Sequence, residues 1–117
     1  MKKLVPFEIA KKLKDKGFNR PTMFLYDDDG ILGALTDMFA PAPSENTFYR
    51  APNIYEVLEW LREEKDLHVR MSVYWIGWCF DITDMNQNSK FIYMSECEYR
   101  KFEQAALAGI NYALDLI

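Results

Sequence analysis

Few residues in this chain have the types and spacing that metal binding or catalysis requires. Cys79, Cys97 and His68 together supply at most three soft or imidazole ligands, whereas a structural zinc site uses four. His68 as a general base would need a nucleophile and an orienting acid, and no local pattern supplies either one. We therefore predict no metal, no cofactor and no catalytic residue, and we interpret both cysteines as ordinary thiols.

One acidic run, Asp27-Asp28-Asp29-Gly30, suggests calcium at first sight. Aligning Gly30 with the glycine of an EF-hand loop places Leu25 at the first ligand position and Thr36 at the last, where carboxylates are needed. The same acidic residues and glycine tolerate left-handed backbone geometry and are typical of a hairpin turn. We predict a turn at these residues and no cation site.

The elements that would position these side chains can be predicted from apolar spacing and from helix-end signals. A helix is expected from Pro6 to about Lys16, with Gly17 as the left-handed residue that ends it. Two short strands, 22–26 and 31–35, should form a β-hairpin. Residues 38–52 contain three prolines and no periodicity, which predicts a long surface loop.

Two sequences of the capping-box type predict where the later helices begin. Asn53-Ile54-Tyr55-Glu56 opens a helix that should end near Lys65, and Ser95-Glu96-Cys97-Glu98 opens a closing helix that should end near Leu116. Gly109 lies inside the closing helix, where glycine is unfavourable. We expect Gly109 at a place where a neighbouring backbone or a large ring leaves no room for a Cβ atom.

The stretch from His68 to Met94 is rich in aromatic and β-branched residues and predicts a three-stranded antiparallel meander. The register that makes one face apolar and the other polar pairs Val69 with Ile82, Met71 with Phe80, Val73 with Trp78 and Arg70 with Asp81. It leaves 74–77 as a four-residue loop. One long bent strand over 68–83 is the alternative.

Taken together, these elements predict an α+β fold in which the helices pack on one face of an antiparallel sheet. At 117 residues, half of them hydrophobic, the chain has the size of a single domain spanning 1–117. No apolar run approaches the ~18 residues of a membrane-spanning helix. Glu8, Lys11 and Lys12 interrupt any signal-peptide core, so we expect a cytoplasmic protein that does not bind membranes.

Charge is unevenly distributed along the chain, whose net charge is −4. Residues 1–20 hold seven lysine and arginine residues against Glu8 and Asp15, and such a basic end suggests nucleic-acid binding. On a helix, however, Lys11, Lys12 and Lys14 would scatter around the axis instead of forming one surface. We therefore keep nucleic-acid binding as the alternative function, and an enzyme whose site forms only on folding as a third.

The predicted turn at Tyr74, Trp75 and Ile76 is an unfavourable place to expose an indole ring and a branched aliphatic side chain. Exposed aromatic anchors of this kind mark protein interfaces. We predict that these three residues contact a protein partner or a second copy of the chain, which favours a non-enzymatic interaction module. Packing of the turn onto the protein's own helix is the alternative.

Two blocks, 51–63 (APNIYEVLEWLRE) and 98–114 with its AALAGI core, resemble small uncharacterised proteins carried by prophages and other mobile elements of gut bacteria. In those proteins a helix containing tyrosine, glutamate, valine, leucine, tryptophan, leucine and arginine precedes a few strands and a closing helix. The resemblance implies a mobile-element accessory protein with an α+β arrangement. It implies no activity, cofactor or site residue, and it does not extend to residues 1–50.

Overall fold

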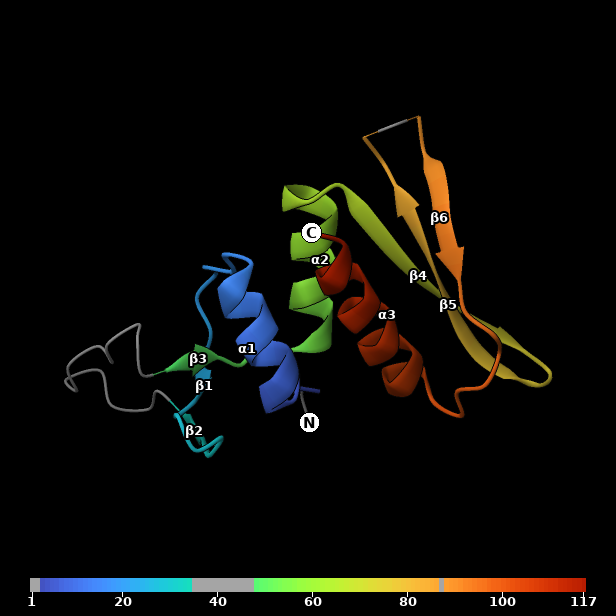
Figure 1. Cartoon of the computed structure of the whole chain (residues 1–117). Helices are drawn as coiled ribbons and strands as arrows, with labels where there is room; N and C mark the ends of the chain where they lie inside the picture. The colour runs from blue at the N-terminus through green and yellow to red at the C-terminus, as the bar shows by residue number, and fades with distance from the viewer. Residues whose placement is uncertain (1–2, 35–47, 87) are drawn as a thin grey trace. The chain divides into compact units, whose positions relative to one another are not determined.

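A computed structural model describes residues 3–34, 48–86 and 88–117 of the chain. These residues form three helices and two three-stranded antiparallel sheets, which confirms the predicted α+β class (Figure 1). The contacts divide the chain into two compact units, Met1–Asn53 and Ile54–Ile117. Within the described residues, no helix is both long and apolar enough to cross a bilayer. The extent of the domain, 1–117, stays a prediction.

In the first unit, helix α1 (Phe7–Asp15) ends as its sequence predicts. Gly17 adopts φ +86°, a left-handed conformation that glycine adopts without a steric penalty. The N–H of Phe18 donates to the carbonyl of Leu13, and the N–H of Gly17 donates to the carbonyl of Lys14. This pair of bonds is the Schellman motif, and it satisfies carbonyl groups that the end of the helix would leave unpaired.

The first sheet has the strand order β2-β1-β3, from β1 (Phe24–Tyr26), β2 (Leu32–Ala34) and β3 (Tyr49–Arg50). The predicted hairpin is confirmed. In its turn the Asp27 carboxylate accepts the N–H groups of Asp29 and Ile31 at 2.9 Å each, and Gly30 has φ +80°. The Asp27 side chain therefore organises the turn by accepting backbone N–H groups, and the predicted turn is confirmed.

Strand β3 corrects the prediction that residues 38–52 form a loop without regular structure. Tyr49 pairs with Tyr26 and Arg50 with Leu25, so the end of that segment is the third strand of the first sheet. The Tyr49 ring meets Phe7 edge-on at 5.3 Å between centroids. The sequence did not predict this pairing, because a two-residue strand is too short to show an alternating pattern. Residues 38–47 lie outside the described residues.

The second unit consists of α2 (Ile54–Glu64), β4 (Leu67–Tyr74), β5 (Gly77–Asp84), β6 (Lys90–Met94) and α3 (Phe102–Leu116). Its sheet has the order β4-β5-β6, and every predicted pair between β4 and β5 is observed. The alternative of one long bent strand is therefore wrong. Helix α2 begins directly after Asn53, as predicted.

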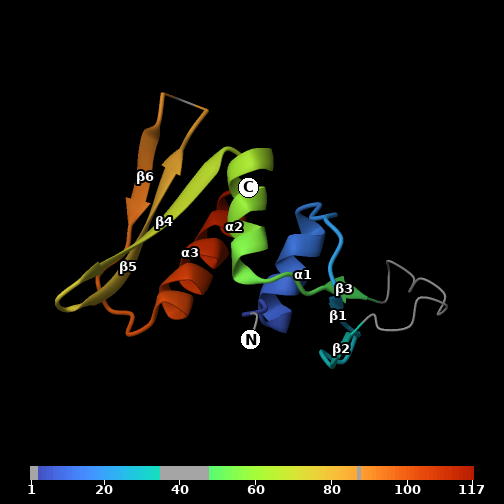
Figure 2. The same cartoon turned by 180° about the vertical axis from the view of Figure 1, so that it is seen from behind.

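Helices α2 and α3 cover one face of this sheet, and the two opposite views agree on the arrangement (Figure 1, Figure 2). Val69, Phe80 and Ile82 point to the covered face and are buried. A Cβ atom on Gly109 would lie 2.7 Å from Val69 Cγ1 and 3.1 Å from Phe80 Cγ. The prediction that a large side chain occupies the space beside Gly109 is confirmed.

The start of α3 differs from the prediction by six residues, because Ser95 is not its N-cap. The Ser95 hydroxyl accepts the N–H of Phe80 at 2.9 Å, and the Ser95 N–H donates to the Phe80 carbonyl. Ser95 thus continues the pairing of β6 along β5. The helix begins at Phe102, where the Gln104 side chain accepts the N–H groups of Arg100 and Lys101. Gln104 therefore supplies the capping bonds that the sequence assigned to Glu98.

Candidate protein-interaction surface

The turn that joins β4 to β5 is shorter than predicted. Tyr74 and Gly77 still pair with each other, so the turn consists of Trp75 and Ile76 and not of four residues. Gly77 has φ +148°, a conformation that residues with a side chain rarely adopt. Pairing up to this point leaves the turn residues at the extreme end of the hairpin.

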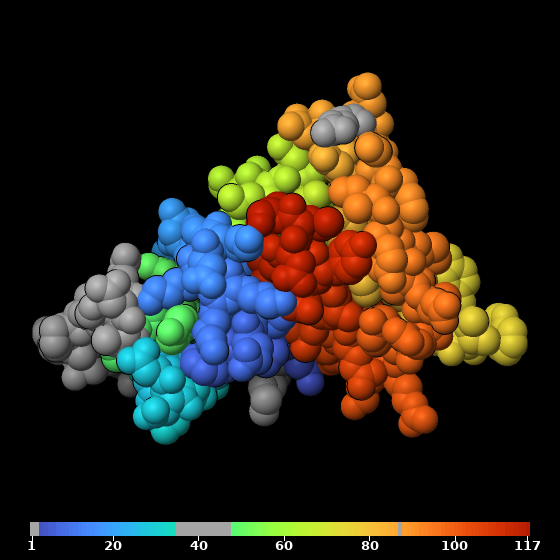
Figure 3. Space-filling model, viewed as in Figure 1, coloured from blue at the N-terminus to red at the C-terminus, as the bar shows by residue number. Residues whose placement is uncertain are grey.

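Four consecutive apolar side chains at this end are exposed, and we call Val73–Ile76 the hairpin tip. The exposed fraction is 96% for Trp75, 60% for Val73, 59% for Ile76 and 51% for Tyr74. In the space-filling view the yellow atoms of the turn project beyond the orange and red atoms of the same unit (Figure 3). An indole that is 96% exposed packs on no helix of its own chain, so that alternative is wrong.

The exposure of the tip follows from the length of the hairpin. Every second residue of β4 points to the face that the helices cover, and these residues include Val69, Met71 and Val73. Val69 is 5% exposed, whereas Val73 on the same face is 60% exposed. In Figure 1 the hairpin extends past the start of α3, so no helix lies over its end. Such unpaired apolar surface is what an interface contains and a free surface avoids.

The base of the tip is held by the segment that follows β6. The N–H of Trp78 donates to the carbonyl of Tyr99 at 2.7 Å, and the N–H of Tyr99 donates back at 3.2 Å. The Trp78 ring meets Phe102 edge-on at 5.5 Å. A Cβ atom on Gly77 would lie 2.7 Å from the carbonyl oxygen of Cys97. The tip therefore stands on a base fixed by backbone hydrogen bonds and close packing.

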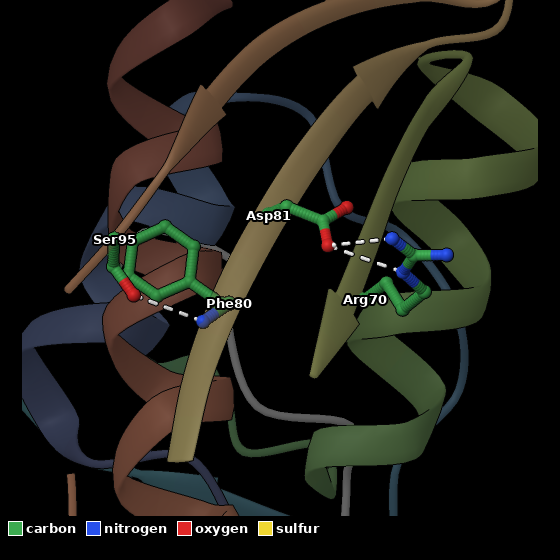
Figure 4. A network of polar contacts seen from close by, with 4 residues as sticks. All are labelled: Arg70, Phe80, Asp81 and Ser95. Carbon is green, nitrogen blue, oxygen red and sulfur yellow. Dashed lines mark hydrogen bonds and ion pairs between the residues drawn. The ribbon is translucent and has the colours of Figure 1, made fainter. Parts of the chain in front are cut away.

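The face of the sheet away from the helices is polar at its centre. There Arg70 and Asp81 form an ion pair across β4 and β5 (Figure 4). Phe91 and Met94 on β6 are 59% and 44% exposed, and their partners Thr83 and Asp81 lie on this same face.

His68 and the two cysteines, which the sequence analysis considered for metal binding or catalysis, lie at different places in the fold. His68 lies half-buried on the edge strand β4, opposite Thr83. Cys79 is buried in β5, and burial, followed by a side-chain hydrogen bond with Cys97, raises the pKa of its thiol. The structure thus brings together two cysteines that are far apart in sequence. Among the described residues, no group of three or more histidine, cysteine or acidic side chains could hold a metal ion.

The basic residues of the first unit have partners close at hand. The Lys14 ammonium donates to the carbonyl of Phe48 at 3.0 Å and lies 4.7 Å from the centre of the Tyr49 ring. The Lys11 ammonium lies 4.0 Å from the Glu8 carboxylate and 5.0 Å from the centre of the Phe7 ring. These two lysines therefore stabilise their own unit, and Lys2 lies outside the described residues.

Comparison of the chain with protein-family models, with curated proteins and with solved structures gave no significant match. The hairpin tip is a run of four consecutive exposed apolar side chains that packing among the described residues leaves unexplained.

Proposed function

We propose that this protein is a non-enzymatic interaction module that binds a protein partner, or a second copy of itself, through the hairpin tip. The 96% exposure of Trp75 is the observation that supports this proposal most directly. Tyr74 and Ile76 flank the indole, and all three stand on a braced base. The resemblance to mobile-element proteins supports an accessory role in that setting.

The composition of the tip suits binding more than chemistry. Tryptophan and tyrosine are enriched among residues that dominate interface energetics, since a rigid ring buries a large area with few rotatable bonds. A tip that is already ordered also binds at a lower entropic cost than a flexible loop. We therefore expect Trp75 to be the central anchor of the interface.

The experiment uses three forms of the full chain: wild type, Trp75→Ala, and Ile31→Ala as the control. Ile31 is 65% exposed and lies in the turn of the other hairpin, so its truncation removes exposed apolar surface that is not part of the tip. Each form is used to capture proteins from the native host, and the captured protein is then purified for direct titration. Sedimentation over a range of concentrations measures self-association of the same three forms.

We expect Trp75→Ala to weaken either the affinity for the purified partner or the affinity of self-association by about 30-fold. This change corresponds to ~2 kcal/mol, which is typical of a hot-spot residue. Ile31→Ala should leave both unchanged. Equal affinities for wild type and Trp75→Ala, with an unchanged monomer mass, would remove the proposal.

A further inference from the structure

The segment 95–99 runs beside β5 and carries Cys97 between two attachments that flank Cys79. Ser95 bonds to the backbone of Phe80 at one end, and Tyr99 bonds to the backbone of Trp78 at the other. Between these anchors, residues 96–98 face the single residue Cys79. This attachment at both ends resembles an enlarged β-bulge, in which the extra residues of one strand are left unpaired and the ladder is locally interrupted.

Contacts on one face of the sheet show which part of β5 lies beside Cys97. Gly77 and Cys79 are two apart on β5 and so point to the same face. The Cys97 carbonyl packs against Gly77, where a Cβ atom would lie 2.7 Å from its oxygen. The backbone attachments of Ser95 and Tyr99 and the contact of the Cys97 carbonyl with Gly77 therefore place Cys97 beside Cys79. The raised pKa of Cys79 agrees with this placement, because burial and then a side-chain hydrogen bond with Cys97 raise it.

We propose that Cys79 and Cys97 are a dithiol site that forms an intramolecular disulfide with a small-molecule disulfide such as oxidised glutathione. The half-buried Cys97 reacts first: its thiolate attacks one sulfur of the oxidant, a mixed disulfide forms, and one glutathione leaves as its thiolate. The Cys79 sulfur then attacks the Cys97 sulfur, and the second glutathione leaves and takes up the Cys79 proton, so that it departs as the thiol. Two protein thiols are oxidised and one disulfide is reduced to two thiols.

The order of the two steps follows from exposure. Cys79 is fully buried, so an oxidant the size of glutathione cannot reach it directly, whereas Cys97 is half-buried. Once the oxidant is attached to Cys97, the Cys79 sulfur is the nearest nucleophile. The backbone hydrogen bonds of Ser95 and Tyr99 to β5 keep the Cys97 segment beside Cys79 during both steps. This proposal does not depend on a partner for the hairpin tip.

The test treats the reduced full chain with oxidised glutathione, blocks remaining thiols with iodoacetamide, and measures the intact mass and a non-reducing peptide map. We expect a monomer lighter by two hydrogens, resistant to alkylation, with a linked peptide pair containing Cys79 and Cys97. The melting temperature should rise by several degrees on oxidation, because the bond constrains the unfolded chain.

Cys79→Ala is the variant that separates the two steps, since it should stop at a stable glutathione adduct on Cys97. Cys97→Ser should remain free of glutathione and show no change in melting temperature. A wild-type protein that stops at the glutathione adduct, or that forms disulfides only between chains, would overturn the proposal. The wild-type peptide map decides this outcome even if a variant does not fold.

Discussion

Arg70 on β4 and Asp81 on β5 meet across the open face of the second sheet, with the Arg70 Nε and Nη2 atoms each 3.1 Å from Asp81 Oδ2. The two side chains differ sharply in exposure: 8% for Asp81 and 66% for Arg70. The carboxylate is therefore shielded from water while its partner remains solvated. The Arg70 guanidinium replaces water as the partner of the Asp81 carboxylate, whose charge would be costly to bury without one.

This asymmetry predicts unequal effects of removing either partner. Arg70→Ala leaves a buried carboxylate without its partner and should lower the free energy of unfolding by about 1–3 kcal/mol. Asp81→Ala leaves an exposed guanidinium that water can solvate, so its loss should be smaller. Urea unfolding followed by tryptophan fluorescence measures both, since all three tryptophans lie in the second unit. Arg62→Ala, at an exposed position on α2, is the control for loss of an arginine. Equal losses for Arg70→Ala and Arg62→Ala would contradict the prediction.

Gly109→Ala should destabilise the protein although alanine is the better helix former. The gain in helix propensity is ~1 kcal/mol, but the added Cβ would lie 2.7 Å from Val69 Cγ1, and overpacking of this kind costs about 1–3 kcal/mol. Val69 is stiff at χ1 and has little freedom to move away.

The double variant with Val69→Ala should therefore recover part of the loss caused by Gly109→Ala. Gly33→Ala, in strand β2 with nothing within 4 Å of the new Cβ, is the control for adding a methyl group without overpacking. Circular dichroism during thermal unfolding compares them, and a higher melting temperature for Gly109→Ala would refute the expectation.

Ser95→Ala should cost more stability than a surface serine would. The hydroxyl of Ser95 accepts the buried N–H of Phe80 and donates to the Glu96 carbonyl at 3.0 Å. Without it a buried donor loses its partner, which costs about 1–3 kcal/mol. Ser95→Thr keeps the hydroxyl and should retain most of the stability, whereas Ser89→Ala, at an exposed turn position, should change little. Fluorescence-monitored urea unfolding gives the ranking, and a neutral Ser95→Ala would show that the bond is dispensable.

Stability should fall at alkaline pH, partly through Tyr26. Burial raises the pKa of Tyr26 above its ordinary value of 10.0, and its hydroxyl donates to the Val5 carbonyl at 2.7 Å. Above about pH 10 the unfolded chain loses this proton more readily than the folded one, so the stabilisation present at lower pH is lost as pH rises.

Tyr26→Phe should lower the free energy of unfolding by ~1 kcal/mol at neutral pH and show a shallower alkaline decline. Part of the decline should remain, because burial also raises the pKa of Tyr99. Unfolding followed by circular dichroism at a series of pH values measures both slopes, and parallel curves would contradict this role for Tyr26.

Local sequence determined the elements whose causes are local. Gly17 ended α1, Asp27 and Gly30 set the first turn, and the alternation of apolar residues fixed the register that pairs Arg70 with Asp81. Register could be predicted because a slip of one residue would move every apolar side chain of β4 and β5 to the polar face. The prediction that an indole stands at the bend followed from that register.

Tertiary structure decided the features that depend on distant partners. Ser95 has the sequence of an N-cap, yet its hydroxyl bonds to Phe80, because β5 presents a buried N–H that only folding brings within reach. Tyr49 pairs with β1, although its local sequence is rich in proline. Cys79 and Cys97 are neighbours only because the chain after β6 continues along β5. Spacing in sequence reports which face of an element a residue occupies, but the partner on that face is set by the path of the whole chain.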